Sequence, residues 1–428
     1  MSKRLDLNSI SEEHKTNILK DLQIKIEGST FASNAVSKYI YPIDILNGIA
    51  YIPFSYGRVC PSGRIPSPDR CTYTDISCSF AGKLRDEQKI VKKEAISHLS
   101  NYGSSIIAAF PGFGKSCTAL YISTKIKLKT LIITHRIVLV KQWKKVINIF
   151  CPGARIQTLT SKSEMTDCDF YIMNATNVPK HPTEFYKDIG FLIVDEIHCI
   201  MAEGLSRCMQ RIVPRYLLGL SATPYREDGL NVLLDLYFGT RKIHRKLHRK
   251  HTVYKIKNDF TPTVELANNG KINWNVILES QANDVNRNEM IIKIVKFFPK
   301  RVFLILCKRV NQGHYLVKRL TEEGEDVTSL IGNQQEFEQK SRILVGTSSK
   351  AGTGFDHPRL NAMILASDIQ AYFIQYLGRC MRTLDGVPIV FDIVDKNPIL
   401  EKHFKVRRST YIEHGGEILD FNKEFPEF

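Results

Sequence analysis

The sequence predicts an α/β protein with two successive lobes, each built on a parallel sheet, behind a small N-terminal α+β region. Three observations support this fold class. From about residue 81, short apolar runs alternate with amphipathic stretches, a second such series begins near residue 300, and the first 80 residues show neither pattern. Apolar runs of roughly four to eight residues, separated by helical periodicity, are typical of buried parallel strands. Two lobes of this kind fit into 428 residues, because one domain usually holds about 100–200.

Residues 1–80 are expected to form an accessory region. Ser9 and Glu12 have the spacing of a capping box, which predicts a helix from there to about Ile24. Aromatic and β-branched residues between Tyr39 and Tyr56 predict short strands.

The two lobes are predicted at 81–240 and 281–428 from their apolar runs. The runs of the first lobe are IIAAF (106–110), LIIT (131–134), FYIM (170–173), FLIVD (191–195) and YLLGLSAT (216–223). Those of the second are VFLILC (302–307), RILVGTS (342–348), AMILAS (362–367) and PIVFDIV (388–394). We expect each run to be a strand that is followed by a helix.

A basic linker is predicted at 241–280. It opens with RKIHRKLHRKH (241–251), which contains six Lys or Arg and three His. The basic pairs recur every four residues, so in a helix they would form one cationic stripe. Two interpretations stay open for this run: a solvated linker face and a contact with nucleic acid.

Composition restricts the class of partner and the compartment. The formal net charge is +16 and the pI is about 9.3, which indicates a polyanionic partner such as nucleic acid or a basic surface without one. The ten cysteines include no C-x-x-C pair, so we expect a reduced, intracellular protein without a zinc site. No apolar run approaches the ~18 residues of a membrane span, and the N-terminus lacks the apolar core of a secretion signal.

The segment AFPGFGKS (109–116) has the composition and context of a phosphate-binding loop, because it follows an apolar strand and precedes a helical pattern. Glycines let the backbone wrap a phosphate, and the helix N-terminus supplies positive potential. Lys115 is expected to reach the β- and γ-phosphates of ATP, and Ser116 to hold Mg²⁺. The residues predicted to bind the nucleotide here are Pro111, Gly112, Phe113, Gly114, Lys115, Ser116 and Cys117.

Two further segments supply groups that ATP hydrolysis requires. In FLIVDEIH (191–198), a buried strand ends on two acids; Asp195 is predicted to hold Mg²⁺ and Glu196 to act as general base on the attacking water. In QYLGRCMR (375–382), Arg379 and Arg382 lie three residues apart on an expected helix of the second lobe. We predict that they act as arginine fingers on the γ-phosphate.

In the order and spacing of these segments, residues 81–428 resemble the superfamily 2 helicases. The resemblance implies two RecA-like lobes with the ATP site in the cleft between them. It assigns adenine recognition to Gln88 of LRDEQ (84–88), and places Gln375 at the nucleotide. It assigns contact with the nucleic-acid backbone to Thr134, His135, Arg136 and Thr347. It assigns coupling of hydrolysis to movement to His198, Ser221, Ala222, Thr223, Gly354 and Asp356.

Within that superfamily the chain is most similar to the XPB-like group, through DEIH, SATPYR (221–226) and QYLGRCMR. The tail 393–416 is similar to the transcript-release helicases of poxviruses and other large DNA viruses. The resemblance implies an ATP- and Mg²⁺-dependent helicase or translocase on duplex, branched or single-stranded DNA, in viral transcription termination, repair or recombination. It also implies contacts with transcription or replication machinery, and for a viral protein a place in the host cytoplasm, the viral factory or the virion.

Three alternatives are weaker. An RNA-directed motor is the closest of them, although the RNA-directed DEAH group usually carries large C-terminal accessory domains and this sequence ends about 45 residues after Arg382. A clamp that binds nucleic acid without productive unwinding is a different class, but Lys115, Glu196 and Arg382 are all present. A small-molecule kinase with a phosphate-binding loop would not need a second lobe.

Overall fold

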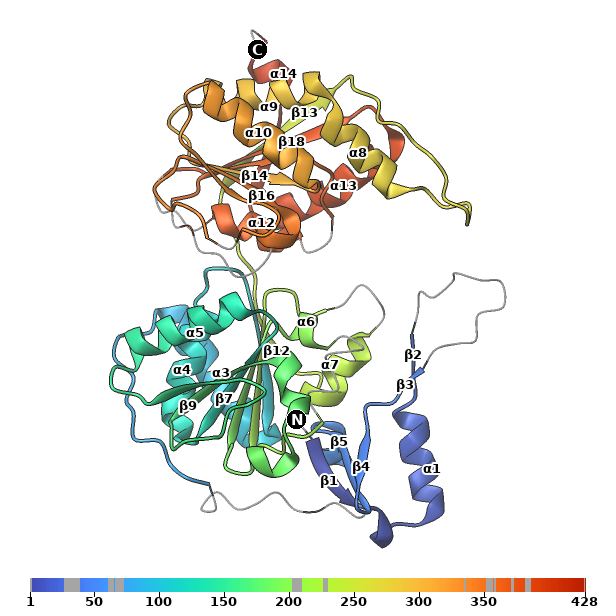
Figure 1. The fold of residues 1–428 in the computed structure, drawn as a ribbon, viewed down its shortest axis with the longest axis vertical. Coiled ribbons are helices and arrows are strands. Elements are labelled where there is room, and N and C mark those ends of the chain that lie inside the picture. Colours follow the sequence, from blue (N-terminus) through green and yellow to red (C-terminus); the bar gives the residue numbers. More distant parts are fainter. Residues whose placement is uncertain are drawn as a thin grey trace. The chain divides into compact units, whose positions relative to one another are not determined.

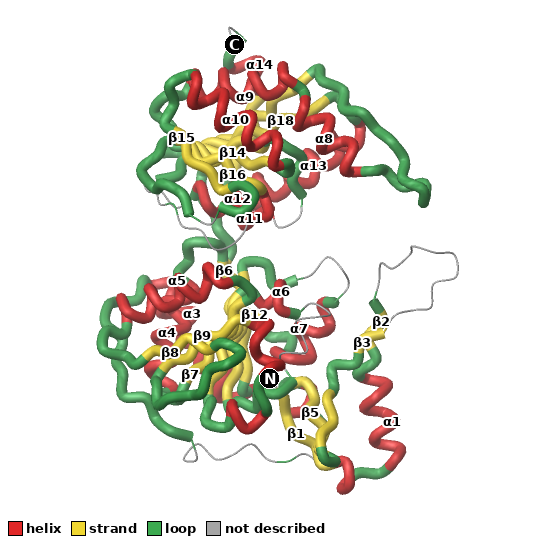
Figure 2. The backbone as a smooth tube through the Cα atoms, in the orientation of Figure 1, coloured by secondary structure: helices red, strands yellow, loops and turns green. Residues whose placement is uncertain are grey.

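The computed structural model describes residues 2–26, 39–60, 65, 73–201, 210–225, 230–334, 336–351, 357, 359–370, 373–381, 386–426 and 428. The chain divides into two compact units, Met1–Ala109 with Phe113–Arg245 and Phe110–Gly112 with Lys246–Phe428. Figures 1 and 2 show a sheet with covering helices in each unit. Among the described residues, every helix is too short or too polar to cross a membrane.

The first unit contains a seven-stranded sheet in its described part, and all of its strand pairs are parallel. In spatial order its strands are β12 (Lys242–Arg245), β6 (Ser104–Ala109), β11 (Tyr216–Ser221), β10 (Phe191–Asp195), β7 (Thr130–Thr134), β9 (Phe170–Asn174) and β8 (Ile156–Leu159). Its helices are α3 (Asp86–Tyr102), α4 (Lys115–Ile126), α5 (Ile137–Phe150), α6 (Ile197–Ile200) and α7 (Asn231–Phe238), with 3-10 turns at Ala175–Lys180 and Thr183–Tyr186. Helices α3, α4 and α5 gather on one side of the sheet and α7 on the other (Figures 1 and 2). The alternation in the sequence therefore predicted the parallel α/β architecture correctly.

The N-terminal region is a small α+β unit that packs on the first lobe. Its three-stranded antiparallel sheet has the order β1 (Ser2–Asp6), β5 (Ile49–Pro53), β4 (Asp44–Leu46). The remaining elements are β2 (Ile24–Lys25), β3 (Tyr39–Ile40), α1 (Glu12–Asp21), α2 (Tyr56–Val59) and a 3-10 turn at Leu7–Ser9. Backbone hydrogen bonds join it to the lobe, from Ser2 N to Ile212 O at 2.8 Å and from Ser55 N to Leu236 O at 3.1 Å.

The predicted cap of the N-terminal helix was wrong by two residues. Ser11, and not Ser9, caps α1, because its hydroxyl accepts a hydrogen bond from the His14 N–H at 3.3 Å. Ser9 lies in the preceding 3-10 turn, where its hydroxyl donates to Asp6 O at 2.8 Å. Serine can cap either structure, and the local pattern alone did not separate the two.

The second unit repeats the architecture with another seven-stranded parallel sheet among the described residues. Its strands, in spatial order, are β15 (Val327–Leu330), β16 (Ile343–Thr347), β14 (Phe303–Cys307), β17 (Ala362–Leu365), β18 (Ile389–Asp395), β13 (His251–Asn258) and β19 (Gly416–Asp420). Its helices are α8 (Trp274–Asn283), α9 (Val285–Phe297), α10 (Val310–Glu322), α11 (Ser348–Ala351), α12 (Phe373–Cys380), α13 (Pro398–Glu413) and α14 (Phe421–Glu424).

Successive residues of each central strand of this sheet enter two different cores. In β14, Phe303 and Ile305 pack with residues of α9 and α10, whereas Leu304 and Leu306 pack with residues of α12 and α13. Side chains alternate between the faces of a strand, so a strand that is buried on both faces is apolar throughout. This explains the continuous apolar runs from which the strands were predicted.

The basic run 241–251 is not a helix. Lys242–Arg245 forms the edge strand β12 of the first sheet, and His251 begins β13 of the second. The three basic pairs therefore do not line up as one helical stripe. The run also crosses the division between the units at Arg245 and Lys246. The domain boundaries at 80, 240 and 280 stay predictions.

Candidate nucleotide-binding site

Four predicted functional segments meet at one edge of the first sheet. In the parallel register, Asp195 of β10 pairs with Leu220 of β11, and Ser221 of β11 pairs with Ala108 of β6. Strand β7, which ends at Thr134, is the other neighbour of β10. The phosphate-binding loop, DEIH, SATPYR and THR (134–136) therefore all begin at carboxyl ends of adjacent strands, where open α/β sheets bind their ligands.

The loop between β6 and α4 has the backbone of a phosphate-binding loop. Gly112 and Gly114 have φ angles of 89° and 88°, a region that favours glycine. Gly114 is also the N-cap of α4, a helix of 12 residues, so that its first amides face the loop. The Lys115 ammonium donates a hydrogen bond to Ala109 O at 2.8 Å, across the base of the loop. These groups fit an anionic phosphate chain, and the nucleotide contacts of the residues from Pro111 to Cys117 stay predictions.

The segment before α3 is bonded to this loop. Gln88 is buried, and its Nε2 donates to Phe113 O at 2.9 Å while its Oε1 accepts from the Arg85 N–H at 2.9 Å. The Arg85 guanidinium donates to the same carbonyl. Arg85 was not identified from the sequence as a residue of this site. The signal that could have found it is its position three residues before Gln88, which is that of a helix N-cap. The predicted adenine contact of Gln88 stays a prediction.

Asp195 is a buried carboxylate with one hydrogen bond to each oxygen. Oδ1 accepts from the Glu196 N–H at 3.0 Å, and Oδ2 accepts from Trp143 Nε1 at 2.8 Å. Burial, followed by the charge of Glu196, raises the pKa of Asp195 to about 7, whereas Trp143 and Lys115 oppose the rise. Two acids at a buried strand end fit a divalent cation, because its charge would offset the cost of holding them there.

Glu196 has an unusual backbone conformation for its residue type. Its φ and ψ are 50° and 56°, in the left-handed region, at the junction of β10 and α6. Residues other than glycine persist there at a cost of about 1–3 kcal/mol, and such residues concentrate at functional sites. Its Oε2 is buried without a hydrogen bond from the described residues, and His198 Nδ1 lies 3.5 Å away. The role of Glu196 as general base stays a prediction.

DEIH and SATPYR are joined by direct contact. His198 is 1% exposed, and its Nδ1 shares a hydrogen bond with Ser221 Oγ at 2.8 Å. The same Oγ accepts from the Thr223 N–H at 3.0 Å. His135 lies near this pair. Burial is the main cause that lowers the pKa of His135 to about 4, and the positive charges of Arg136 and His198 add to the decrease. The contacts bring together residues predicted for coupling.

Two predicted nucleic-acid contacts have buried hydroxyls. Thr134 is fully buried and its Oγ1 donates to Arg136 O at 3.3 Å, while Thr347 is 4% exposed with its Oγ1 3.3 Å from Ser349 Oγ. These hydroxyls support turns. Arg136 is half-exposed at the N-cap of α5 and is the better candidate for a phosphate contact. The four assignments stay predictions.

Five further predicted site residues belong to the second unit. Gln375 and Arg379 lie on α12, and both are buried, at 3% and 8% exposure. Gly354, Asp356 and Arg382 lie outside the described residues. The roles of Gln375, Arg379 and Arg382 toward ATP therefore remain predictions.

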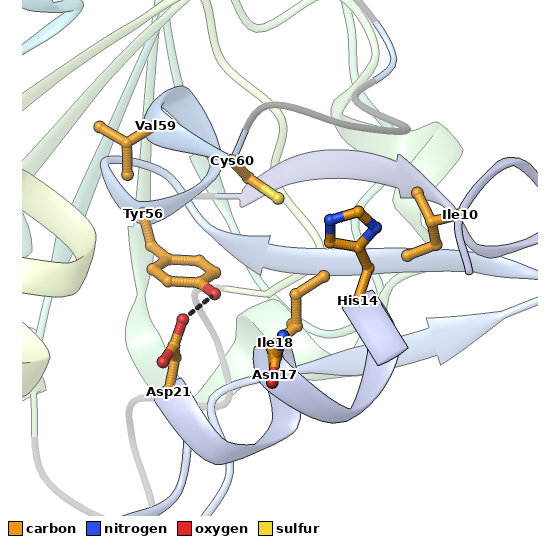
Figure 3. Close-up of a pocket in the computed structure, with 8 residues that line it drawn as sticks. All are labelled: Ile10, His14, Asn17, Ile18, Asp21, Tyr56, Val59 and Cys60. Carbon is orange, nitrogen blue, oxygen red and sulfur yellow. Dashed lines mark hydrogen bonds between the residues drawn. The ribbon is translucent and has the colours of Figure 1, made fainter. Parts of the chain in front are cut away.

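The N-terminal region contains a separate small cavity of about 190 Å³ (Figure 3). The Tyr56 hydroxyl donates to Asp21 Oδ2 at 2.8 Å within it. Burial, followed by the Asp21 hydrogen bond, raises the pKa of Tyr56. None of the residues predicted for ATP or nucleic acid lines this cavity.

Among the described side chains, no cluster of three or more His, Cys, Asp or Glu could hold a metal ion.

Comparisons with known proteins identify the family of the chain. A family model described as "Type III restriction enzyme, res subunit" matches residues 81–226. "Putative helicase 161L" of Invertebrate iridescent virus 6 is 39% identical over 98% of this chain and 100% of its own length. "Putative helicase 055L" of Frog virus 3 is 33% identical, over 86% of this chain and 85% of its own length.

A solved structure shares the fold. "S. cerevisiae Dbp5 L327V bound to RNA and ADP BeF3" superposes with a TM-score of 0.56 over 79% of this chain and 91% of that one, at 13% identity. The two sheets described above are thus a pair of RecA-like lobes. Together with the relatives of nearly full length, this establishes that the chain belongs to the superfamily 2 helicases, in the group found in large DNA viruses.

Proposed function

We propose that this helicase is an ATP-dependent motor that translocates on or unwinds DNA. Membership of the family implies an ATPase that depends on nucleic acid, and the proposal adds the substrate and the residues. The observation that carries it is the single sheet edge at which the phosphate-binding loop, two acids and the His198–Ser221 contact meet.

Each group at that edge has one expected task. Lys115 and the amides of the loop would bind the β- and γ-phosphates, and Ser116 and Asp195 would hold Mg²⁺. The chemistry that a bound Mg²⁺ supplies is positive charge beside the phosphate oxygens. Glu196 would orient a water molecule and accept its proton, from a carboxylate that lacks a hydrogen bond at Oε2 among the described residues.

Movement would follow from the same cycle. We propose that Arg379 and Arg382 respond to the γ-phosphate, so that binding and hydrolysis alternate the two lobes between states. Arg136 of the first lobe and the segment at Thr347 of the second would hold the backbone of one strand. Contacts of this kind tolerate any sequence and weaken with salt, and the formal net charge of +16 suits a polyanionic track.

The names of two more distant relatives favour different nucleic acids. "DNA 3'-5' translocase XPB2" of Sulfurisphaera tokodaii is 24% identical over 73% of this chain and 82% of its own length. "Putative ATP-dependent RNA helicase L396" of Acanthamoeba polyphaga mimivirus is 26% identical over 94% of this chain and 82% of its own length. We favour DNA because DEIH, SATPYR and QYLGRCMR resemble the XPB-like group. An RNA-directed motor is the second candidate.

The decisive experiment measures phosphate release by the full chain with single-stranded, duplex and forked DNA and with RNA of matched sequence. Stimulation by DNA above that by RNA supports the proposal, and the reverse order would make the second candidate the better one. Glu196→Gln serves as the control for contaminating ATPases. Stimulated hydrolysis without strand displacement on every fork would indicate a translocase, whereas binding without stimulated hydrolysis would indicate a clamp.

A further inference from the structure

A buried tryptophan is hydrogen-bonded to the predicted Mg²⁺ ligand. Trp143 is 2% exposed, and its Nε1 donates to Asp195 Oδ2 at 2.8 Å. The two residues come from different elements, α5 and the end of β10. Because Oδ1 already accepts from the Glu196 N–H at 3.0 Å, the indole completes a pair of donors that sets the plane of the carboxylate.

The hydrogen bond from the indole N–H constrains the Asp195 carboxylate, which packing of the ring alone would not do. A buried indole N–H requires an acceptor, and a hydrogen bond to a carboxylate is stronger than one between neutral groups. Each oxygen of Asp195 keeps a second lone pair for a cation or for its water. Partners of metal ligands orient those ligands, and their loss commonly reduces metal affinity about 10–100-fold.

Helix α5 connects this contact to the predicted nucleic-acid segment. Arg136 is the N-cap of α5, and Trp143 follows seven residues later, which is about 10 Å along a helix. The buried residues of α5 are Leu139, Trp143 and Ile147, spaced four apart, so they form one face toward the sheet. A shift of the helix at its N-terminus would therefore move the indole against Asp195.

We propose that Trp143 is a positioning residue: it orients the Asp195 carboxylate for Mg²⁺ and links nucleic-acid contact at the start of α5 to the geometry of that ligand. The proposal rests on the proposed function, in which Asp195 holds Mg²⁺. It assigns to the indole N–H a task that the aromatic ring by itself cannot perform.

The test uses Trp143→Phe, which keeps a ring in the core and removes the donor. The measured quantity is the Mg²⁺ concentration for half-maximal binding of a fluorescent, non-hydrolysable ATP analogue to the full chain. We expect this concentration to rise about 10–100-fold in Trp143→Phe. Thermal unfolding checks that the variant is folded, and Trp143→Leu provides a second apolar variant without a side-chain donor.

The chain offers a matched control. Its only other tryptophan is Trp274, which stacks on His403 in the second unit with 5.0 Å between ring centroids. Trp274→Phe should leave the Mg²⁺ dependence unchanged. In that background Trp143 is the sole tryptophan, so its emission should change when Mg²⁺ and the analogue bind, and should change less when Asp195 is replaced by Asn.

The link to nucleic acid is measured by repeating the Mg²⁺ titration with a saturating oligonucleotide. The oligonucleotide should lower the half-maximal Mg²⁺ concentration of the unaltered chain, because coupling between two ligands is reciprocal. Trp143→Phe should lose most of that effect. An unchanged Mg²⁺ dependence in folded Trp143→Phe, with a clear loss in Asp195→Asn, would overturn this inference alone. An unchanged dependence in Asp195→Asn as well would overturn the Mg²⁺ assignment on which it rests.

Discussion

The Nδ1 atom of His198 and the Oγ atom of Ser221 lie 2.8 Å apart inside the first lobe and share a hydrogen bond. This contact joins α6, the short helix that follows β10, to the end of β11, the strand adjacent to β10. Because His198 Nδ1 also lies 3.5 Å from Glu196 Oε2, His198 lies between the predicted general base and SATPYR, the segment predicted to couple hydrolysis to movement.

Ser221→Ala should separate hydrolysis from movement. The change removes the hydroxyl that His198 and the Thr223 N–H share, and loss of a buried hydrogen-bond partner costs about 1–3 kcal/mol. We expect nucleotide binding to persist and strand displacement per ATP hydrolysed to fall. The matched control is Ser105→Ala, which removes another buried serine bonded to a histidine, His98, at 3.2 Å near the start of β6. An equal loss of displacement in both variants would reduce the effect to general destabilisation.

Lys115 and Glu196 should fail in different ways. Lys115→Ala should weaken ATP binding and turnover together, since the ammonium is expected on the phosphates. Glu196→Gln should keep ATP binding and lower turnover about 10²–10⁴-fold, the usual contribution of a general base. Equilibrium binding and single-turnover hydrolysis separate the two outcomes. Normal turnover in Glu196→Gln would remove Glu196 from the role of base.

Arg379 and Arg382 test whether the second lobe takes part in hydrolysis. Loss of a true arginine finger costs about a thousandfold or more in turnover. Alanine at either position should therefore abolish DNA-stimulated hydrolysis while ATP binding persists. Lysine should not rescue it, because a point charge lacks the planar fork of a guanidinium. Normal hydrolysis in both alanine variants would contradict the proposed mechanism.

The basic run 241–251 requires a narrower test than neutralisation of all three pairs. Arg245 pairs with Glu94 at 2.6 Å, and Lys246 pairs with Glu413 at 2.6 Å, so their removal would also change the stability of the protein. Lys250 is exposed, and no ion pair or hydrogen bond to its side chain occurs among the described residues. Lys250→Ala should lower DNA affinity and reduce the salt slope by about 0.7–0.9.

The control for that prediction is Arg245→Ala. It should lower the unfolding temperature with a smaller effect on DNA affinity, since a partly exposed ion pair is worth up to about 1 kcal/mol. Fluorescence anisotropy at several salt concentrations gives the slope. If Lys250→Ala leaves the slope unchanged, the run is a solvated connection between the lobes.

Mg²⁺-dependent nucleotide binding should weaken below neutral pH. Burial raises the pKa of Asp195 to about 7, so as the pH falls below 7 a growing share of the carboxyl is protonated and must lose its proton before it binds the cation. The apparent Mg²⁺ affinity should fall up to about tenfold per pH unit below 7 and level off above it. Titrations from pH 5.5 to 8.5 test this, and Asp195→Asn should remove the dependence on this group.

The central strands of both sheets were predictable because they are apolar on both faces. FLIVD coincides with β10, Phe191–Asp195. Strands with mixed exposure were missed, among them β8, Ile156–Leu159, and β19, Gly416–Asp420. A half-exposed strand lacks a continuous apolar run, and its pairing with a distant neighbour decides its conformation.

The sequence by itself determined the two-lobed parallel architecture, the order of the motifs and the glycine-rich loop before α4. Each of these follows from local patterns of polarity, spacing and residue type. Only the tertiary structure decided that Trp143 bonds Asp195, 52 residues away, that Arg85 shares a carbonyl of the loop with Gln88, and that 242–245 is a strand. The physical reason is that these features depend on partners far along the chain. Hydrogen bonds across elements and strand pairing with a distant neighbour leave no periodic signal near the residues that make them.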